Sequence, residues 1–108
     1  MPIYDLYGFS SADLKEAKNL LEAALSIHFD ARDSTYEGGD YFHHGERDGE
    51  DFVLKRNVDP FDDEPAELSF PTYPILFYVN DTLRSEDLQQ KLAQVEGNLV
   101  LLRHEDLQ

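Results

Sequence analysis

The chain has 108 residues, of which 41% are hydrophobic and 13 are aromatic, so it indicates one globular domain over residues 1–108 and argues against a disordered chain. It contains no cysteine, which excludes disulfides and thiolate metal sites, and its net charge of −14 argues against binding to nucleic acid or to an anionic membrane. Its first residues lack the basic and apolar regions of a signal peptide, and its apolar runs are too short to span a membrane. We therefore expect a cytoplasmic protein.

The first predicted elements are a strand over residues 3–9 and a helix over about residues 11–26. The strand is rich in aromatic and aliphatic residues, and from Leu14 to Leu25 apolar residues recur at helical spacing. Ser10 and Ser11 stand where a helix needs a capping residue. We interpret these two serines as caps rather than as catalytic nucleophiles.

The middle of the chain predicts strands joined by glycine-rich turns. Alternation from Ile27 onward indicates a strand, and residues 40–44 and 51–56 have the pattern of the two arms of a hairpin. The turn between the arms is residues 45–49. We interpret Gly38-Gly39 as a tight turn, since no helix follows that could complete a phosphate site.

The C-terminal third predicts a strand, a helix and a last strand. Residues 75–80 form a continuous apolar run, typical of a central strand covered on both faces. Ser85 is predicted to cap the second helix and Gly97 to end it, and residues 98–104 form the last strand. The buried stripe of this helix is predicted to be Leu88, Leu92 and Val95. The order β-α-β-β-β-β-α-β predicts an α+β fold, with a mostly antiparallel sheet of five to six strands and two helices on one face.

Acidic residues concentrate in the middle of the chain. Residues 30–67 contain 13 acidic and 4 basic residues, and within them lies the proline-bounded loop DPFDDEPAE, residues 59–67. The spacing of its carboxylates does not fit a calcium-binding loop, so we predict no metal and no cofactor. A dense negative charge on a stiffened loop favours a basic partner, above all a nuclease, whose substrate groove must be positive.

The residues predicted to contact such a partner are the acidic and aromatic side chains of this loop and of the preceding diglycine turn. Phe61 has two alternatives, because its ring either anchors in a pocket of the partner or tucks under its own loop, and the second alternative is favoured. The full set is Asp33, Tyr36, Glu37, Asp40, Tyr41, Asp59, Phe61, Asp62, Asp63, Glu64 and Glu67.

The chain resembles the bacterial immunity proteins that neutralise toxins of contact-dependent growth inhibition and related polymorphic-toxin systems. The resemblance lies in the layout of a small, acidic, cysteine-free α+β chain and in the phrases YGFSSADLKEAKNLLEAAL, FDARDSTYEGGDYF and FPTYPILFYVND. It implies stoichiometric binding to a cognate toxin domain at the C-terminus of a large secreted toxin. It also implies that the chain itself is not an enzyme.

Two alternatives remain open. One is a small enzyme that depends on a carboxylate and a histidine, which a pocket joining two carboxylates and a histidine would favour. His43 and His44 are adjacent in a predicted strand and should point to opposite faces, so a site built on both is not expected. The other is a structural or regulatory module, which would expose a large apolar patch.

Overall fold

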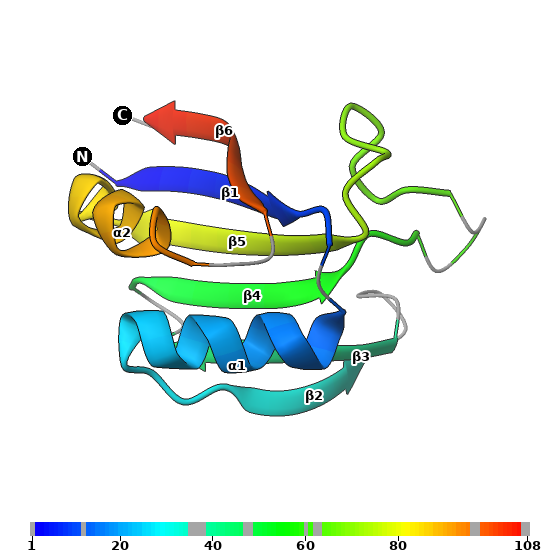
Figure 1. The fold of residues 1–108 in the computed structure, drawn as a ribbon, viewed down its shortest axis with the longest axis horizontal. Coiled ribbons are helices and arrows are strands. Elements are labelled where there is room, and N and C mark those ends of the chain that lie inside the picture. The colour runs from blue at the N-terminus through cyan, green and yellow to red at the C-terminus, as the bar shows by residue number, and fades with distance from the viewer. Residues whose placement is uncertain are drawn as a thin grey trace.

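The protein is an antiparallel sheet of six strands with two helices, as the computed structural model shows (Figure 1). The structure describes residues 2–11, 13–34, 39–46, 49–59, 61, 64–95 and 98–106. The elements in chain order are β1 (Ile3–Phe9), α1 (Leu14–Leu25), β2 (Asp30–Ser34), β3 (Gly39–Gly45), β4 (Asp51–Arg56), β5 (Ile75–Thr82), α2 (Ser85–Leu92) and β6 (Leu99–Asp106). The predicted fold class and element order are therefore confirmed.

The strands lie side by side in the order β2-β3-β4-β5-β1-β6, and every neighbouring pair is antiparallel. Strands β2, β3 and β4 follow one another directly, whereas β1 lies between β5 and β6 and pairs with both. Strand β5 has a neighbour on each side, as predicted for a central strand. The sheet has two edges, β2 and β6.

Both helices cover the same face of the sheet (Figure 1). The apolar stripe of α1, from Leu14 to Leu25, and the stripe of α2 at Leu88 and Leu92 belong to one cluster of buried residues. The strands contribute its aromatic centre, in which Phe77 lies 5.6 Å from Phe52 between ring centroids. Burying these stripes against one sheet face is what holds the two helices in place.

The long segment between β4 and β5 packs on part of the opposite face of the sheet, where Glu67 bonds to Tyr78 and Tyr73 approaches Gly8. Leu6 and Leu76 are buried on this face, outside the cluster beneath the helices. A Cβ atom on Gly8 would lie 2.8 Å from the ring of Tyr73 and 2.8 Å from Leu102. The chain therefore needs glycine at position 8 so that Tyr73 can close over the strands.

Two predicted helix starts are wrong in detail. Asp13 caps α1, because its carboxylate accepts a hydrogen bond of 2.8 Å from the backbone N–H of Glu16, and neither Ser10 nor Ser11 takes this role. Ser85 does not cap α2, since the N-cap position is Arg84 and no side chain bonds to the free N–H groups there. Ser85 is instead buried, with 3% of its surface exposed.

The bounds of two other elements, β2 and α2, differ from the predicted ones by only a few residues. Strand β2 begins at Asp30, so the alternation from Ile27 overestimates it by three residues, and Phe29 just before the strand packs into the core. Helix α2 ends at Leu92, with the Ala93 N–H bonded to the carbonyl oxygen of Gln89 at 2.9 Å. Gly97, the predicted helix end, lies outside the described residues.

Candidate functional site

The sheet topology brings the two predicted acidic segments to the same end of the sheet. Strands β2 and β3 are joined through residues 35–38, and Tyr41, near the start of β3, pairs with Lys55, near the end of β4. The loop that starts after Arg56 therefore leaves the sheet at the end where β2 stops and β3 begins (Figure 1). Tyr36, Glu37, Asp62 and Asp63 lie outside the described residues.

Asp33 and Asp40 face each other across strands β2 and β3. They are register partners, and both are exposed. Neither carboxylate forms an ion pair within the described part of the chain. Like charges directly opposite on a sheet are destabilising. This pair therefore concentrates negative charge at the sheet edge at a small cost to the fold.

Tyr41 and Phe42 point to opposite faces, as predicted. Phe42 lies on the helix side, 6.2 Å from the ring of Phe29 between centroids, and the ammonium group of Lys18 lies 5.6 Å from its centroid. Tyr41 is half-buried and lies on the other face. Both rings are half-buried, and Tyr41 is the one that lies on the face away from the helices.

The acidic loop is folded tightly at its start. The N–H of Asp59 donates to the carbonyl oxygen of Glu64 at 2.6 Å, and the carboxylate of Asp59 accepts from the N–H of Phe61 at 2.9 Å. Phe61 is 74% exposed, so the favoured expectation that its ring tucks under the loop is wrong. Glu64 is also exposed. An exposed ring beside carboxylates has the composition of a contact point for another protein.

Glu67 differs from the other predicted residues because its carboxylate is bound within the fold. It accepts a hydrogen bond of 2.7 Å from the hydroxyl of Tyr78 and pairs with Arg103 at 3.2 Å, and its backbone N–H donates to Asn57. Burial raises the pKa of Glu67, but the hydroxyl of Tyr78 and the guanidinium of Arg103 outweigh it and hold the pKa below its usual value. Glu67 therefore fastens the loop to the sheet, and a partner could use it only by breaking these contacts.

A second polar site, which was not predicted from the sequence, is centred on Asp5. Its side chain is completely buried, with Oδ2 accepting from the hydroxyl of Ser85 at 2.5 Å and Oδ1 lying 2.5 Å from Nδ1 of His104. The amide of Gln89 donates to the hydroxyl oxygen of Ser85 at 3.0 Å, so the single hydroxyl hydrogen of Ser85 points to Asp5. A carboxylate at this position can accept hydrogen bonds at both oxygens, and in the tautomer of His104 with its hydrogen on Nδ1 the ring donates one of them.

This arrangement leaves Nε2 of His104 as the acceptor nitrogen beside a pocket of about 720 Å³. The pocket lies between α2 and the start of β1 and also contains two carboxylates. It is lined by Ile3, Leu83, Arg84, Ser85, Glu86, Asp87, Gln89, Leu101 and His104. The signal that could have revealed it is the position of Asp5, which alternates in phase with the buried Tyr7 and Phe9.

The rings of His43 and His44 make contacts within the fold. His44 stacks on Phe52 with ring centroids 5.9 Å apart, and its Nδ1 lies 2.8 Å from the carbonyl oxygen of His28. His43 lies on the other face, 3.6 Å from a carboxylate oxygen of Asp51. The two adjacent histidines therefore point apart, as predicted.

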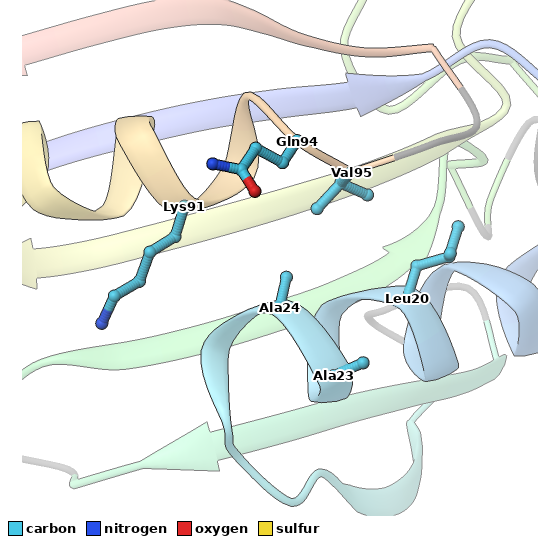
Figure 2. Close-up of a pocket in the computed structure, with 6 residues that line it drawn as sticks. All are labelled: Leu20, Ala23, Ala24, Lys91, Gln94 and Val95. Atoms are coloured by element: carbon cyan, nitrogen blue, oxygen red, sulfur yellow. The ribbon is translucent and has the colours of Figure 1, made fainter.

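Another pocket, of about 500 Å³, lies between the two helices (Figure 2). Its walls are mostly aliphatic, and the one charged side chain among its described lining residues, Lys91, pairs with Asp87 at 3.3 Å. Figure 2 shows its six lining residues, which are Leu20, Ala23, Ala24, Lys91, Gln94 and Val95. Among these six residues there is no carboxylate, histidine or hydroxyl group.

The described part of the chain also bears on whether the protein holds a metal ion or crosses a membrane. Within the described ranges, no three histidine, aspartate or glutamate side chains are placed to hold a metal ion. No helix in that part of the chain is long and apolar enough to cross a membrane. No protein-family model matches the chain, and no curated protein matches it.

Proposed function

We propose that the protein is an immunity protein that binds and neutralises a cognate basic toxin domain, and that this toxin is a nuclease, the class that the charge of the protein fits best. It would act as a stoichiometric inhibitor in the cytoplasm of the cell that makes the toxin. The observation that supports this function most is the convergence of two acidic segments at one end of the sheet, with Asp33 and Asp40 facing each other there. The fold itself gains nothing from this pair of like charges.

The proposed mechanism is electrostatic complementarity followed by close contact. Asp33, Asp40, Asp59 and Glu64 would attract the positive substrate groove of the toxin and speed its association. The exposed ring of Phe61 would then fill an apolar recess next to that groove. Carboxylates placed in a nuclease groove occupy the positions of substrate phosphates, so binding there excludes the nucleic acid.

The proposal predicts that the gene directly upstream encodes a large secreted protein that ends in a toxin domain, and the test uses that domain. Purified protein and toxin domain should form a one-to-one complex, and the complex should lose nuclease activity. The Asp33→Asn, Asp40→Asn variant should associate more slowly at low salt, with a shallower dependence of the association rate on salt. Replacing Asp62, Asp63 and Glu64 with Asn, Asn and Gln tests the loop in the same way. Unchanged association rates for both variants would remove these segments from the interface.

A second candidate function is a small enzyme using general acid–base catalysis at His104. The supporting observation is a pocket that joins Glu86 and Asp87 with His104, whose ring is oriented by the buried Asp5. In this case His104 Nε2 would accept a proton from a bound hydroxyl or water. Hydrolysis of small ester substrates that is lost in His104→Gln and retained in His43→Gln would favour this function over the first.

A further inference from the structure

Basic side chains are scarce in this protein, and at least half of those that the structure describes are paired. The chain has 9 lysines and arginines against 23 aspartates and glutamates. Ion pairs join Lys18 to Glu22, Lys91 to Asp87, Arg84 to Glu50, and Arg103 to Glu67 and Glu105. Within the described residues, Lys15, Arg32 and Arg56 form no ion pair. Unpaired cations are unexpected where carboxylates are so abundant.

Two of these cations line one groove at the sheet end described above. Lys15, near the start of α1, and Arg56, the last residue of β4, border two pockets of about 620 and 380 Å³ that also share Leu14. We call these joined pockets the Lys15–Arg56 groove. Lys18 also lines the smaller pocket. Arg32 borders it too, but strand alternation directs its side chain to the opposite face, beside Tyr41.

Stability does not explain the charge at position 15. Lys15 is in the first turn of α1, where the helix dipole favours negative side chains and disfavours positive ones. Among the residues that the structure describes, its ammonium group has no ion-pair partner in return. Arg56 is also exposed and has no ion pair with any described residue, although Asp40 lines the same pocket. These two cations are therefore better explained by something that binds in the groove.

We propose that the Lys15–Arg56 groove binds a carboxylate side chain of the partner, an assignment that rests on the proposed function. Nucleic acid and anionic membranes carry many negative charges and are repelled by a net charge of −14. A single aspartate or glutamate on an otherwise basic protein is not repelled in this way, and guanidinium and ammonium groups are suitable donors to it.

The charge of the resulting interface alternates between negative and positive. Asp33 and Asp40 lie on one side of the groove and the acidic loop from Asp59 onward follows Arg56 on the other, so positive charge lies between two negative segments. A uniformly basic protein would meet repulsion at the groove, whereas a partner with a carboxylate at the matching position would not. The groove would therefore determine which basic protein is bound and in which orientation.

The first test separates this site from general electrostatic attraction. Lys15→Glu and Arg56→Glu each make the protein more negative, and Lys91→Glu makes the same change of charge outside the groove. If only general attraction matters, all three variants should bind the upstream-encoded toxin domain at least as tightly as the wild type. We expect Lys15→Glu and Arg56→Glu to weaken binding about tenfold or more, because each replaces an attraction by a repulsion, while Lys91→Glu does not weaken it. Equal affinities for the three variants would overturn the proposal.

The second test does not need the toxin domain, so it distinguishes failure of the groove from failure of the proposed function. Isotope-labelled full-length protein is titrated with N-acetylglutamate amide, with N-acetylglutamine amide and with inorganic phosphate, at matched ionic strength. We expect saturable changes in the NMR signals of Lys15 and Arg56 with the glutamate compound alone, and their loss in the Lys15→Gln, Arg56→Gln variant. Equal changes with the glutamine compound, larger ones with phosphate, or none at all would each overturn the assignment to a carboxylate.

Discussion

Two groups of carboxylates have opposite roles in this molecule. Asp5, Glu50 and Glu67 are held by hydrogen bonds and charges within the fold, from Ser85 and His104, from Thr82 and Arg84, and from Tyr78 and Arg103. Asp33 and Asp40 are exposed and face each other without a cation between them in the described structure. The first group connects strands and helices, whereas the second adds only negative charge to a surface.

The difference teaches that net charge along a sequence is a poor measure of the charge available to a partner. Glu50 and Glu67 both fall in the acidic middle third of the chain, yet each one is neutralised by an arginine from a distant segment. The surface that remains is smaller than the sequence suggests. Part of it, with Asp33 and Asp40, lies at one end of the sheet beside a positive groove.

The largest expected effect on stability comes from removing the carboxylate of Asp5, which is completely buried. Asp5→Ala would leave the buried hydroxyl of Ser85 and the ring of His104 without their acceptor, and we expect the free energy of unfolding to fall by about 2–4 kcal/mol. Urea denaturation measures this change. The matched variant Asp33→Ala, on the exposed group, should change the free energy by less than about 0.5 kcal/mol. Similar losses for the two variants would contradict the comparison.

An intermediate effect on stability is expected when the pH is lowered, because Glu50 and Glu67 are then protonated. The hydrogen bond from Arg84 is the main cause that lowers the pKa of Glu50, while for Glu67 burial raises the pKa and is outweighed by the contacts from Tyr78 and Arg103. A carboxyl whose pKa is lower in the folded state binds fewer protons there than in the unfolded chain. Its stabilisation is therefore present above the unfolded pKa of about 4.3 and is lost as the pH falls through the folded value.

The Glu50→Gln, Glu67→Gln variant should accordingly lose less stability than the wild type when the pH is lowered from about 5 to about 3. Denaturation curves recorded at several pH values measure the difference. The variant should also be less stable at neutral pH, because the arginines lose their charged partners. Parallel pH profiles for the two proteins would show that these carboxylates do not hold the fold through their charge.

The smallest effect is expected from the exposed pair. Asp33→Asn and Asp40→Asn should each raise the free energy of unfolding by about 0.2–0.5 kcal/mol, since each one removes the same repulsion. The double variant should gain little more than either single variant, because the repulsion can be removed only once. A double-mutant cycle measured by urea denaturation checks this. Fully additive gains would mean that the two carboxylates do not interact.

Much of the fold could be predicted from the sequence because local patterns determine it. The apolar stripe of α1 and the alternation of the β3–β4 hairpin reflect single elements with one buried face, and both are observed. The helix starts were harder, since Ser10, Ser11 and Asp13 are all suitable capping residues and only the geometry selects among them. Ser85 resembles a cap in sequence but is drawn inward by Asp5, which lies 80 residues away.

The candidate site was predicted less completely. Proline and acidic residues indicated the loop at residues 59–67, but the sequence could not show that Glu67 turns inward, because Arg103 and Tyr78 approach it only in the folded sheet. Nor could it show that Phe61 is exposed or that Lys15 and Arg56 share a groove. Each of these depends on contacts between segments far apart in the chain.

The pairing of β1 with β6 also determines when the protein can finish folding. Asp5 and His104 are 99 positions apart, so their contact and the outer ladder of β1 must wait until β6 has been synthesised. Until then β1 presents an open edge, and the carboxylate of Asp5 lacks one of its two partners. Contacts at such long sequence separation slow folding. During translation the sheet of a ribosome-bound chain would therefore remain unfinished until this last strand has been added.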